Sequence, residues 1–168
     1  MDLPENQNDS LQFVRGFFLV SDDGVPRLVR EWVTASKTPI PDVHIELPPE
    51  AKTKLLRSRD GSGMIVRWKG TLTAISVLDS EAFERCLAYF TEDQSWNLRE
   101  EVTYGSASGK KLIRTGEAIQ GHFKDITYLL SVPGGHIDVT TGCAGKQLDK
   151  LALLERLLED AFRTATVS

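Results

Sequence analysis

Cysteine and histidine are scarce in this chain of 168 residues, which holds two cysteines and three histidines. The histidines, His44, His122 and His136, fall on separate predicted elements, and neither a CxxC nor an HExxH pair occurs. A structural zinc site uses closely spaced ligands of these two kinds, and a disulfide framework needs several cysteine pairs. We therefore predict that the protein has no metal site, no cofactor and no disulfide bond.

Long apolar runs are also lacking, since no stretch approaches the ~18 apolar residues that a membrane span requires. The first residues, MDLPENQNDS, are acidic and polar, whereas a secretory signal has a cationic start and an apolar centre. A chain of this length is typical of one domain. We expect a cytoplasmic protein without membrane contact, in which residues 1–10 are a mobile tail and residues 11–168 a single domain.

An excess of positive charge is absent as well. Lysine and arginine number 20 against 24 aspartates and glutamates, so the formal net charge is −4. Proteins that bind nucleic acids present a basic face to the phosphates. The composition therefore argues against a nucleic-acid partner.

A phosphate-binding loop is missing too, although the stretch VTTGCAGKQLDKL (residues 139–151) has its general layout. A Walker-type loop needs four residues before its Gly-Lys pair and a hydroxyl residue after it. Here only two residues separate Gly142 from Gly145, and Gln147 follows Lys146. The glycines are better explained as turn residues.

Alternating apolar residues and turn signals predict a series of strands. These are residues 11–20, 43–47, 63–70, 71–79, 98–104, 111–119, 123–132 and 136–141. The stretch 27–35 is compatible with either helix or strand.

Three helices are predicted. Pro48 and Pro49 suit the first turn of a short helix through residues 50–58, and Asp79 or Ser80 caps a helix that runs to about Phe90. The last helix, from about Lys146, combines an apolar stripe with a charged outer face. The stripe is Leu148, Leu151, Leu154, Leu158, Ala161, Phe162 and Ala165, and the outer face is Lys146, Lys150, Arg156, Glu159 and Arg163.

The four late strands follow one another with short turns, which favours an antiparallel meander. We predict an α+β fold, in which a largely antiparallel sheet carries the C-terminal amphipathic helix and one or two further helices on one face. No strand is predicted after the last helix. The turn VPGGHI predicts a hairpin with Gly134 and Gly135 as its loop, which pairs Val132 with Ile137 and places this apolar face in the core.

The other face of this hairpin carries the residues with most chemical potential. His136, Asp138 and Thr140 alternate along one strand, Ser131 is expected opposite Asp138, and Cys143 follows in a loop. Together they could supply a nucleophile, a base and an orienting carboxylate. Because catalysis needs a concave site that excludes water, a flat outer strand face favours a solvated or partner-binding surface, and we predict no enzyme activity.

The order of elements resembles the PsbP-like α/β sandwich group. The resemblance lies in IELP near the start, paired strands, the helix SEAFERCLAYF, consecutive strands that end in HIDVTTG, and a closing helix with LERLLEDAF. It extends over roughly residues 41–164. The resemblance implies a small binding protein without catalysis, a group that includes adaptor chaperones and immunity proteins of bacterial type VI secretion.

We therefore expect an immunity protein that neutralises a bacterial toxin by occluding it. The expected partner-binding residues in the turn TEDQS are Glu92 and Asp93, followed directly by a half-exposed Trp96. His136 and Asp138 are expected to join them from the outer sheet face. One alternative is a secretion adaptor chaperone, which would expose an apolar sheet face. Another is a small hydrolase using His136, Asp138 and Cys143, which would show a deep pocket at Cys143.

Overall fold

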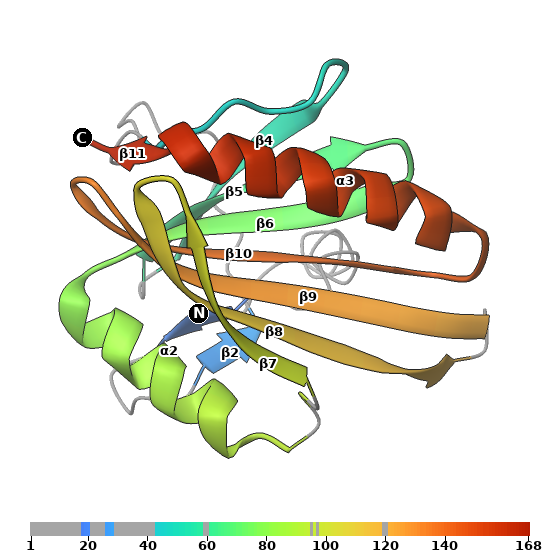
Figure 1. Cartoon of the computed structure of the whole chain (residues 1–168), viewed down its shortest axis with the longest axis horizontal. Helices are drawn as coiled ribbons and strands as arrows, with labels where there is room; N and C mark the ends of the chain where they lie inside the picture. Colours follow the sequence, from blue (N-terminus) through green and yellow to red (C-terminus); the bar gives the residue numbers. More distant parts are fainter. Residues whose placement is uncertain are drawn as a thin grey trace.

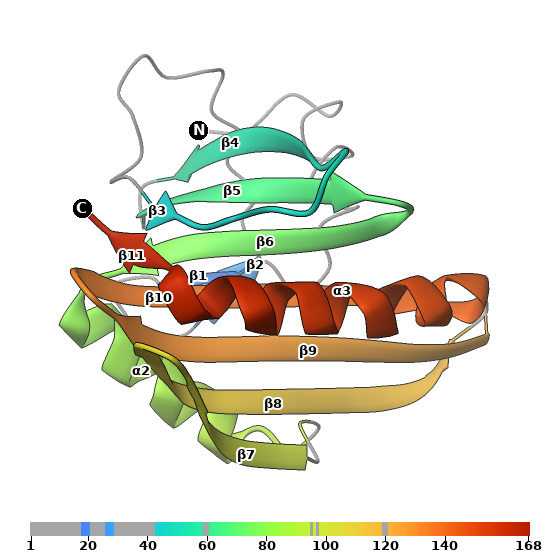
Figure 2. The ribbon, with the colours of Figure 1, turned by 45° about the horizontal axis from the view of Figure 1, so that its top comes forward.

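The structure is a computed structural model that describes residues 18–20, 26–28, 43–58, 61–94, 96, 98–118 and 121–168. Its main feature is an antiparallel seven-stranded sheet with the strand order β4-β5-β6-β10-β9-β8-β7 (Figures 1 and 2). The strands are β4 (Lys52–Ser58), β5 (Gly61–Trp68), β6 (Thr71–Leu78), β7 (Leu98–Tyr104), β8 (Ala107–Ala118), β9 (Gly121–Val132) and β10 (Gly135–Ala144). The predicted α+β class with a large antiparallel sheet is confirmed.

Helix α3 (Leu148–Ala161) lies across one face of this sheet, between two short 3-10 turns, η1 (Gly145–Gln147) and η2 (Phe162–Thr164) (Figure 2). The predicted apolar stripe packs on the sheet, where Leu151, Leu154 and Leu158 are each 1% exposed. Burying leucine side chains of this kind contributes about 1.5–3 kcal/mol each. The C-terminal helix is therefore held by the core that the sequence predicted.

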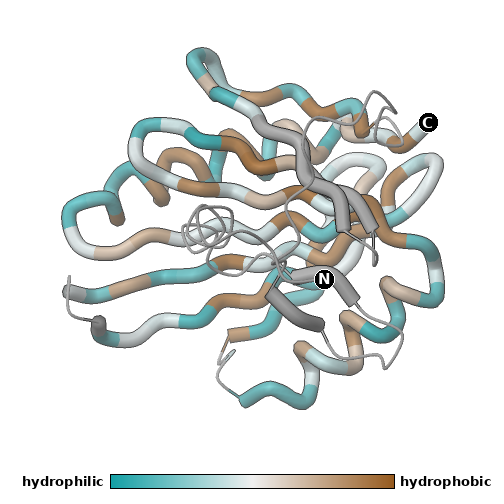
Figure 3. Tube along the Cα trace, turned by 180° about the vertical axis from the view of Figure 1, so that it is seen from behind, coloured by the Kyte–Doolittle hydropathy of each residue, from teal (hydrophilic) through white to brown (hydrophobic). Residues whose placement is uncertain are grey.

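Helix α2 (Ser80–Glu92) covers the opposite face, so the prediction that the helices share one face is wrong (Figures 1 and 2). The Asp79 carboxylate caps this helix by accepting a hydrogen bond from the Ala82 N–H at 2.7 Å. Phe83 and Phe90 are buried against Leu129 of β9. Figure 3, which views the molecule from behind, shows hydrophilic residues recurring along α2. The reason for two covered faces is that β9 is apolar on both sides.

The hairpin between β9 and β10 has the predicted core face but not the predicted register. Gly135 pairs with Val132, so Pro133 and Gly134 form the loop, and Ile137 lies opposite Leu130. Gly134 has a φ of 94°, which suits the third position of a turn whose second residue is proline. A Cβ at Gly134 would lie 1.6 Å from the Val167 carbonyl oxygen. The two-residue shift leaves every side chain on its predicted face.

A short strand follows the last helix, which corrects the prediction that none does. Strand β11 (Thr166–Val167) pairs with β3 (Val43–His44), and the Val167 N–H donates to the Pro133 carbonyl at 2.9 Å. The predicted strand at residues 43–47 is thus confirmed only for its first two residues. Since β10 pairs antiparallel with both of its neighbours, β6 and β9, the stretch 139–151 does not form the parallel unit of a phosphate loop.

The predicted helix after Pro48 and Pro49 is wrong, because this segment forms β4. The Ala51 N–H donates to the Pro48 carbonyl at 3.2 Å, and Glu50 has a φ of 69°, so the prolines start a turn. The chain then pairs with β5 along seven residues. Pairing with a neighbouring strand overrides the local preference.

Near the start of the chain, β1 (Phe18–Val20) pairs with β2 (Pro26–Leu28). The end of the predicted strand 11–20 is confirmed, and Arg27 and Leu28 are in a strand. The tail at residues 1–10 and the stretch 29–35 lie outside the described residues. Among the helices that the structure describes, none has the length and apolar composition for a membrane span.

Replacing Leu158 with alanine is expected to lower the free energy of unfolding by about 2–5 kcal/mol, because it leaves a cavity between α3 and the sheet. Leu153 lies on the same helix but is 40% exposed, so Leu153→Ala is a matched control that should cost less than about 1 kcal/mol. Chemical denaturation of both variants measures the difference. Equal losses would contradict this placement of α3.

Candidate functional site

The predicted nucleophile, base and carboxylate do not come together. Cys143 lies in β10 rather than in a loop, and its side chain packs on the α3 side of the sheet. The side chains of His136 and Asp138 lie on the opposite face of β10, toward α2. Burial also raises the pKa of the Cys143 thiol, which disfavours the reactive thiolate. The arrangement expected for the hydrolase alternative is absent from this strand.

His136 joins the first turn of α2 to the sheet. Its ring stacks on Phe83 with the centroids 4.4 Å apart. Its Nδ1 lies 2.9 Å from the Ser131 hydroxyl and its Nε2 lies 3.2 Å from the Ser80 hydroxyl. A catalytic imidazole of the serine-hydrolase type has a carboxylate at the second nitrogen, whereas here a hydroxyl occupies that position. The contacts indicate that His136 fastens the helix.

The Ser131–His136 pair is a contact that sequence reasoning missed. Ser131 was expected opposite Asp138, but it lies opposite His136. The difference comes from the two-residue shift in the hairpin register. Pro133 before Gly134 was the available signal, because proline favours the second and glycine the third of the four residues of a type II turn.

Asp138 is not on a solvated outer face, as predicted, but is 3% exposed. Its carboxyl accepts a hydrogen bond from the Thr140 hydroxyl at 2.9 Å, and Thr140 in turn lies 3.1 Å from the Thr127 hydroxyl. Burial raises the pKa of Asp138 to about 7. The buried Cys86 thiol of α2 has its pKa raised by burial and by the nearby Asp138. Asp138 is therefore an internal group that a partner protein does not reach.

Trp96 is also buried, at 2% exposure, although the sequence predicted a half-exposed contact residue. Its indole meets Phe90 edge to face, with ring centroids 5.3 Å apart. The Arg114 guanidinium lies over the other part of the indole, 4.6 Å from its centroid, and binds Asp125 at 2.7 Å. Trp96 thus anchors the loop between α2 and β7 in the core.

The backbone of that loop is held by hydrogen bonds. The Trp96 N–H donates to the Asp93 carbonyl at 3.2 Å. Arg99 turns back on the loop, where its Nε donates to the Trp96 carbonyl at 3.2 Å and its Nη2 to the Asp93 carbonyl at 3.1 Å. These hydrogen bonds fix the backbone of Asp93 and Trp96 relative to Arg99 of β7.

Four acidic residues flank this loop in the sequence, and we call them the acidic corner: Glu92, Asp93, Glu100 and Glu101. Glu92 ends α2 and is exposed, and Asp93 is half-buried. Glu100 and Glu101 are exposed on β7, and Glu101 lies 3.8 Å from Lys110. Such an exposed ion pair contributes little stability, so exchanging Lys110 for a basic side chain of a partner would cost Glu101 little free energy.

A second charged cluster lies beneath α3. Glu159 was predicted on the outer face of the helix, but its carboxylate accepts hydrogen bonds from Lys111 at 2.7 Å and Tyr128 at 2.6 Å. Lys111 also donates to Glu155 at 2.5 Å. Burial lowers the pKa of Lys111, but the hydrogen bonds to both glutamates outweigh it and raise the pKa. Because Lys111 is only 8% exposed, this cluster fastens α3 to the sheet.

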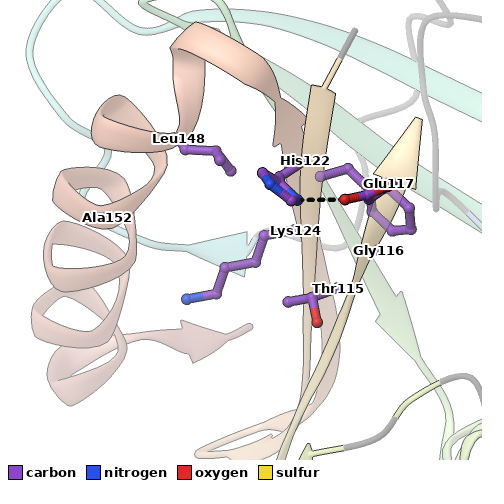
Figure 4. Close-up of a pocket in the computed structure, with 8 residues that line it drawn as sticks. Thr115, Gly116, Glu117, His122, Lys124, Leu148 and Ala152 are labelled. Carbon is purple, nitrogen blue, oxygen red and sulfur yellow. Dashed lines mark ion pairs between the residues drawn. The ribbon is translucent and has the colours of Figure 1, made fainter. Parts of the chain in front are cut away.

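An open cavity of about 440 Å³ lies between the β8–β9 hairpin and the start of α3 (Figure 4). It is lined by Thr115, Gly116, Glu117, His122, Phe123, Lys124, Leu148 and Ala152. His122 and Glu117 approach to 3.6 Å, with their side chains 76% and 80% exposed. The pair is in contact with water, and the lining residues do not include Cys143, where the hydrolase alternative expected a pocket.

The buried Asp138 predicts a pH dependence of stability. Its pKa is about 7 in the folded chain and near its ordinary 3.8 when unfolded, so the unfolded chain loses this proton first. The Asp138 contribution to stability therefore falls from about pH 4 to pH 7 and stays low above pH 7. Asp138→Asn should match the wild type at pH 4 and exceed it by up to about 4 kcal/mol at pH 8. Denaturation at both pH values measures this gap, and a gap that stays constant would contradict it.

Comparison with models of known protein families and with characterised proteins finds no match to this chain. Within the described ranges, no group of three or more His, Cys, Asp or Glu residues is placed to hold a metal ion. The acidic corner, in which Glu92, Glu100 and Glu101 are exposed, is the charged surface on which the proposed function rests.

Proposed function

We propose that this chain is a non-enzymatic, protein-binding immunity protein, which neutralises a bacterial toxin by covering it. The acidic corner is the centre of its binding surface. The observation that supports this proposal is the combination of exposed carboxylates with a buried anchor, Trp96. The proposed location is the cytoplasm, which suits the free thiols of Cys86 and Cys143.

A rigid charged surface favours binding for two reasons. Ordering a loop when a complex forms costs free energy, and the hydrogen bonds from Arg99 and Trp96 reduce that cost in advance. Carboxylates also attract a basic surface over a distance and speed association. The proposed partner therefore presents a basic cleft or patch.

The alternatives have less support. A secretion adaptor would expose an apolar sheet face, but α3 and α2 cover the two faces. The large apolar side chains that are exposed in the described part of the chain are Leu98 and Leu153, on different elements. For the hydrolase, Cys143 and His136 lie on opposite faces of β10. Asp138 and Trp96 are buried, so neither is retained as a partner contact, and His136 is retained only as a structural residue.

Charge reversal at the acidic corner tests the proposal. The variant Glu92→Lys/Asp93→Lys should slow association with the partner at least tenfold and make it less sensitive to salt. Asp149→Lys/Asp160→Lys on α3 is a matched control, because it changes the net charge equally on exposed residues of the helix that covers the sheet face opposite α2. The partner is obtained by affinity capture on the wild-type protein, and surface plasmon resonance gives the rates.

The stability of each variant is measured alongside, since surface changes are expected to cost less than about 0.5 kcal/mol. Equal association rates for the wild type and the corner variant would contradict the proposal. Slower association in the α3 control variant alone would indicate that the partner binds at α3 and not at the acidic corner.

Removal of the reactive side chains tests the absence of catalysis. Cys143→Ala/His136→Ala is expected to protect a toxin-expressing cell as well as the wild type does, because neither side chain belongs to the acidic corner. The loss of the His136 hydrogen bonds should cost about 1–3 kcal/mol, so folding is checked by circular dichroism. Loss of protection by a folded variant would favour the hydrolase.

A further inference from the structure

Strand β7 forms one edge of the seven-stranded sheet and pairs only with β8 in the described sheet order. Its residues from Leu98 to Glu101 are exposed, and Leu98 is 54% exposed. In an antiparallel pair, alternate backbone N–H and C=O groups of an edge strand point away from the neighbouring strand. This edge therefore offers hydrogen-bonding groups along its free side.

The edge is rigid because both of its ends are anchored. At its start, Arg99 is bonded to the loop carbonyls of Asp93 and Trp96. At its end, Tyr104 is 9% exposed and its ring centroid lies 5.8 Å from that of Phe162. The stretch LREEVTY contains no proline, which would remove a backbone donor. An added strand would therefore find a preformed template.

The charges of β7 indicate what such a strand carries. Glu100 shares the α3 side with Leu98 and Val102, and Glu101 lies on the other side with Thr103. Lys111, opposite Glu100, is held by Glu155 and Glu159. Both sides of the free edge therefore present a carboxylate that a basic residue of an added strand can neutralise.

A second copy of the chain is a poor occupant. Two β7 strands in antiparallel pairing centred on Glu101 would bring the two Glu101 carboxylates opposite each other. Parallel pairing in register would do the same for both Glu100 and Glu101. Like charges opposite one another destabilise a strand pair. Charge complementarity selects a basic segment of another protein.

We infer that β7 is the docking edge for an extended, basic segment of the partner, which joins the sheet as an additional strand. This inference rests on the proposed function and specifies how the partner binds. Backbone hydrogen bonds hold such a segment, and alternate side chains give specificity. Lysines opposite Glu100 and Glu101 and apolar residues opposite Leu98 and Val102 complete the match.

The probe is the peptide Thr-Thr-Val-Lys-Lys-Thr-Val, added to the full-length, isotope-labelled protein. We expect binding that shifts the β7 amide resonances and slows hydrogen exchange at alternate residues of β7. The same peptide with N-methyl groups on alternate residues keeps its charges but loses its donors, and should bind at least tenfold more weakly. A peptide with glutamates in place of the lysines should also bind at least tenfold more weakly.

Three outcomes would overturn the inference. These are no binding up to about 1 mM peptide, equal affinity after N-methylation, and resonance shifts that map away from β7. Self-association of the protein through β7, measured by sedimentation and by the same amide shifts, would instead assign the edge to a second copy and would overturn it too.

The proposed function and the docking edge can be tested independently of each other. Glu100→Lys/Glu101→Lys alters the edge, whereas Glu92→Lys/Asp93→Lys alters the end of α2. Partner binding that is lost in the second variant but kept in the first, with no peptide binding, would leave the proposed function standing and reject the edge. Peptide binding that depends on backbone donors supports β7 as the docking edge, whether or not Glu92→Lys/Asp93→Lys changes partner binding.

Discussion

Strand β9 is buried on both of its faces, and the rest of the fold depends on that constraint. Ile126, Tyr128 and Leu130 belong to the core under α3, while Leu129 belongs to the core under α2, and all four are 0% exposed. A strand of this kind cannot slip by one residue without moving every side chain to the opposite face. The two helices must therefore lie on opposite sides of the sheet.

The acidic corner follows from this arrangement. Strand β6 lies inside the sheet and β7 lies at its edge. Helix α2, which connects them, therefore crosses one face of the sheet, and the chain re-enters the sheet at its edge as β7. Trp96 and Arg114 fill the space where it returns, and Glu92, Glu100 and Glu101, which flank this anchor in the sequence, are exposed.

Much of the sheet could be predicted, because period-two alternation and glycine turns are local signals that match β5, β6 and β7. The β9–β10 register could not be read from alternation, since a shift of two residues leaves the pattern unchanged, and only Pro133 marked it. The β4 strand depends on pairing with β5. The burial of Trp96 depends on Phe90 and on the distant Arg114. The exposed site was thus less predictable than the core.

We propose that this protein acts by occupying its partner and not by catalysis. The most direct test is a titration in which the captured toxin is held at a concentration far above the dissociation constant and its remaining activity is measured against added protein. We expect a linear loss of toxin activity that is complete at about one molecule of protein per molecule of toxin. Complete loss of toxin activity at a small fraction of that ratio would contradict it.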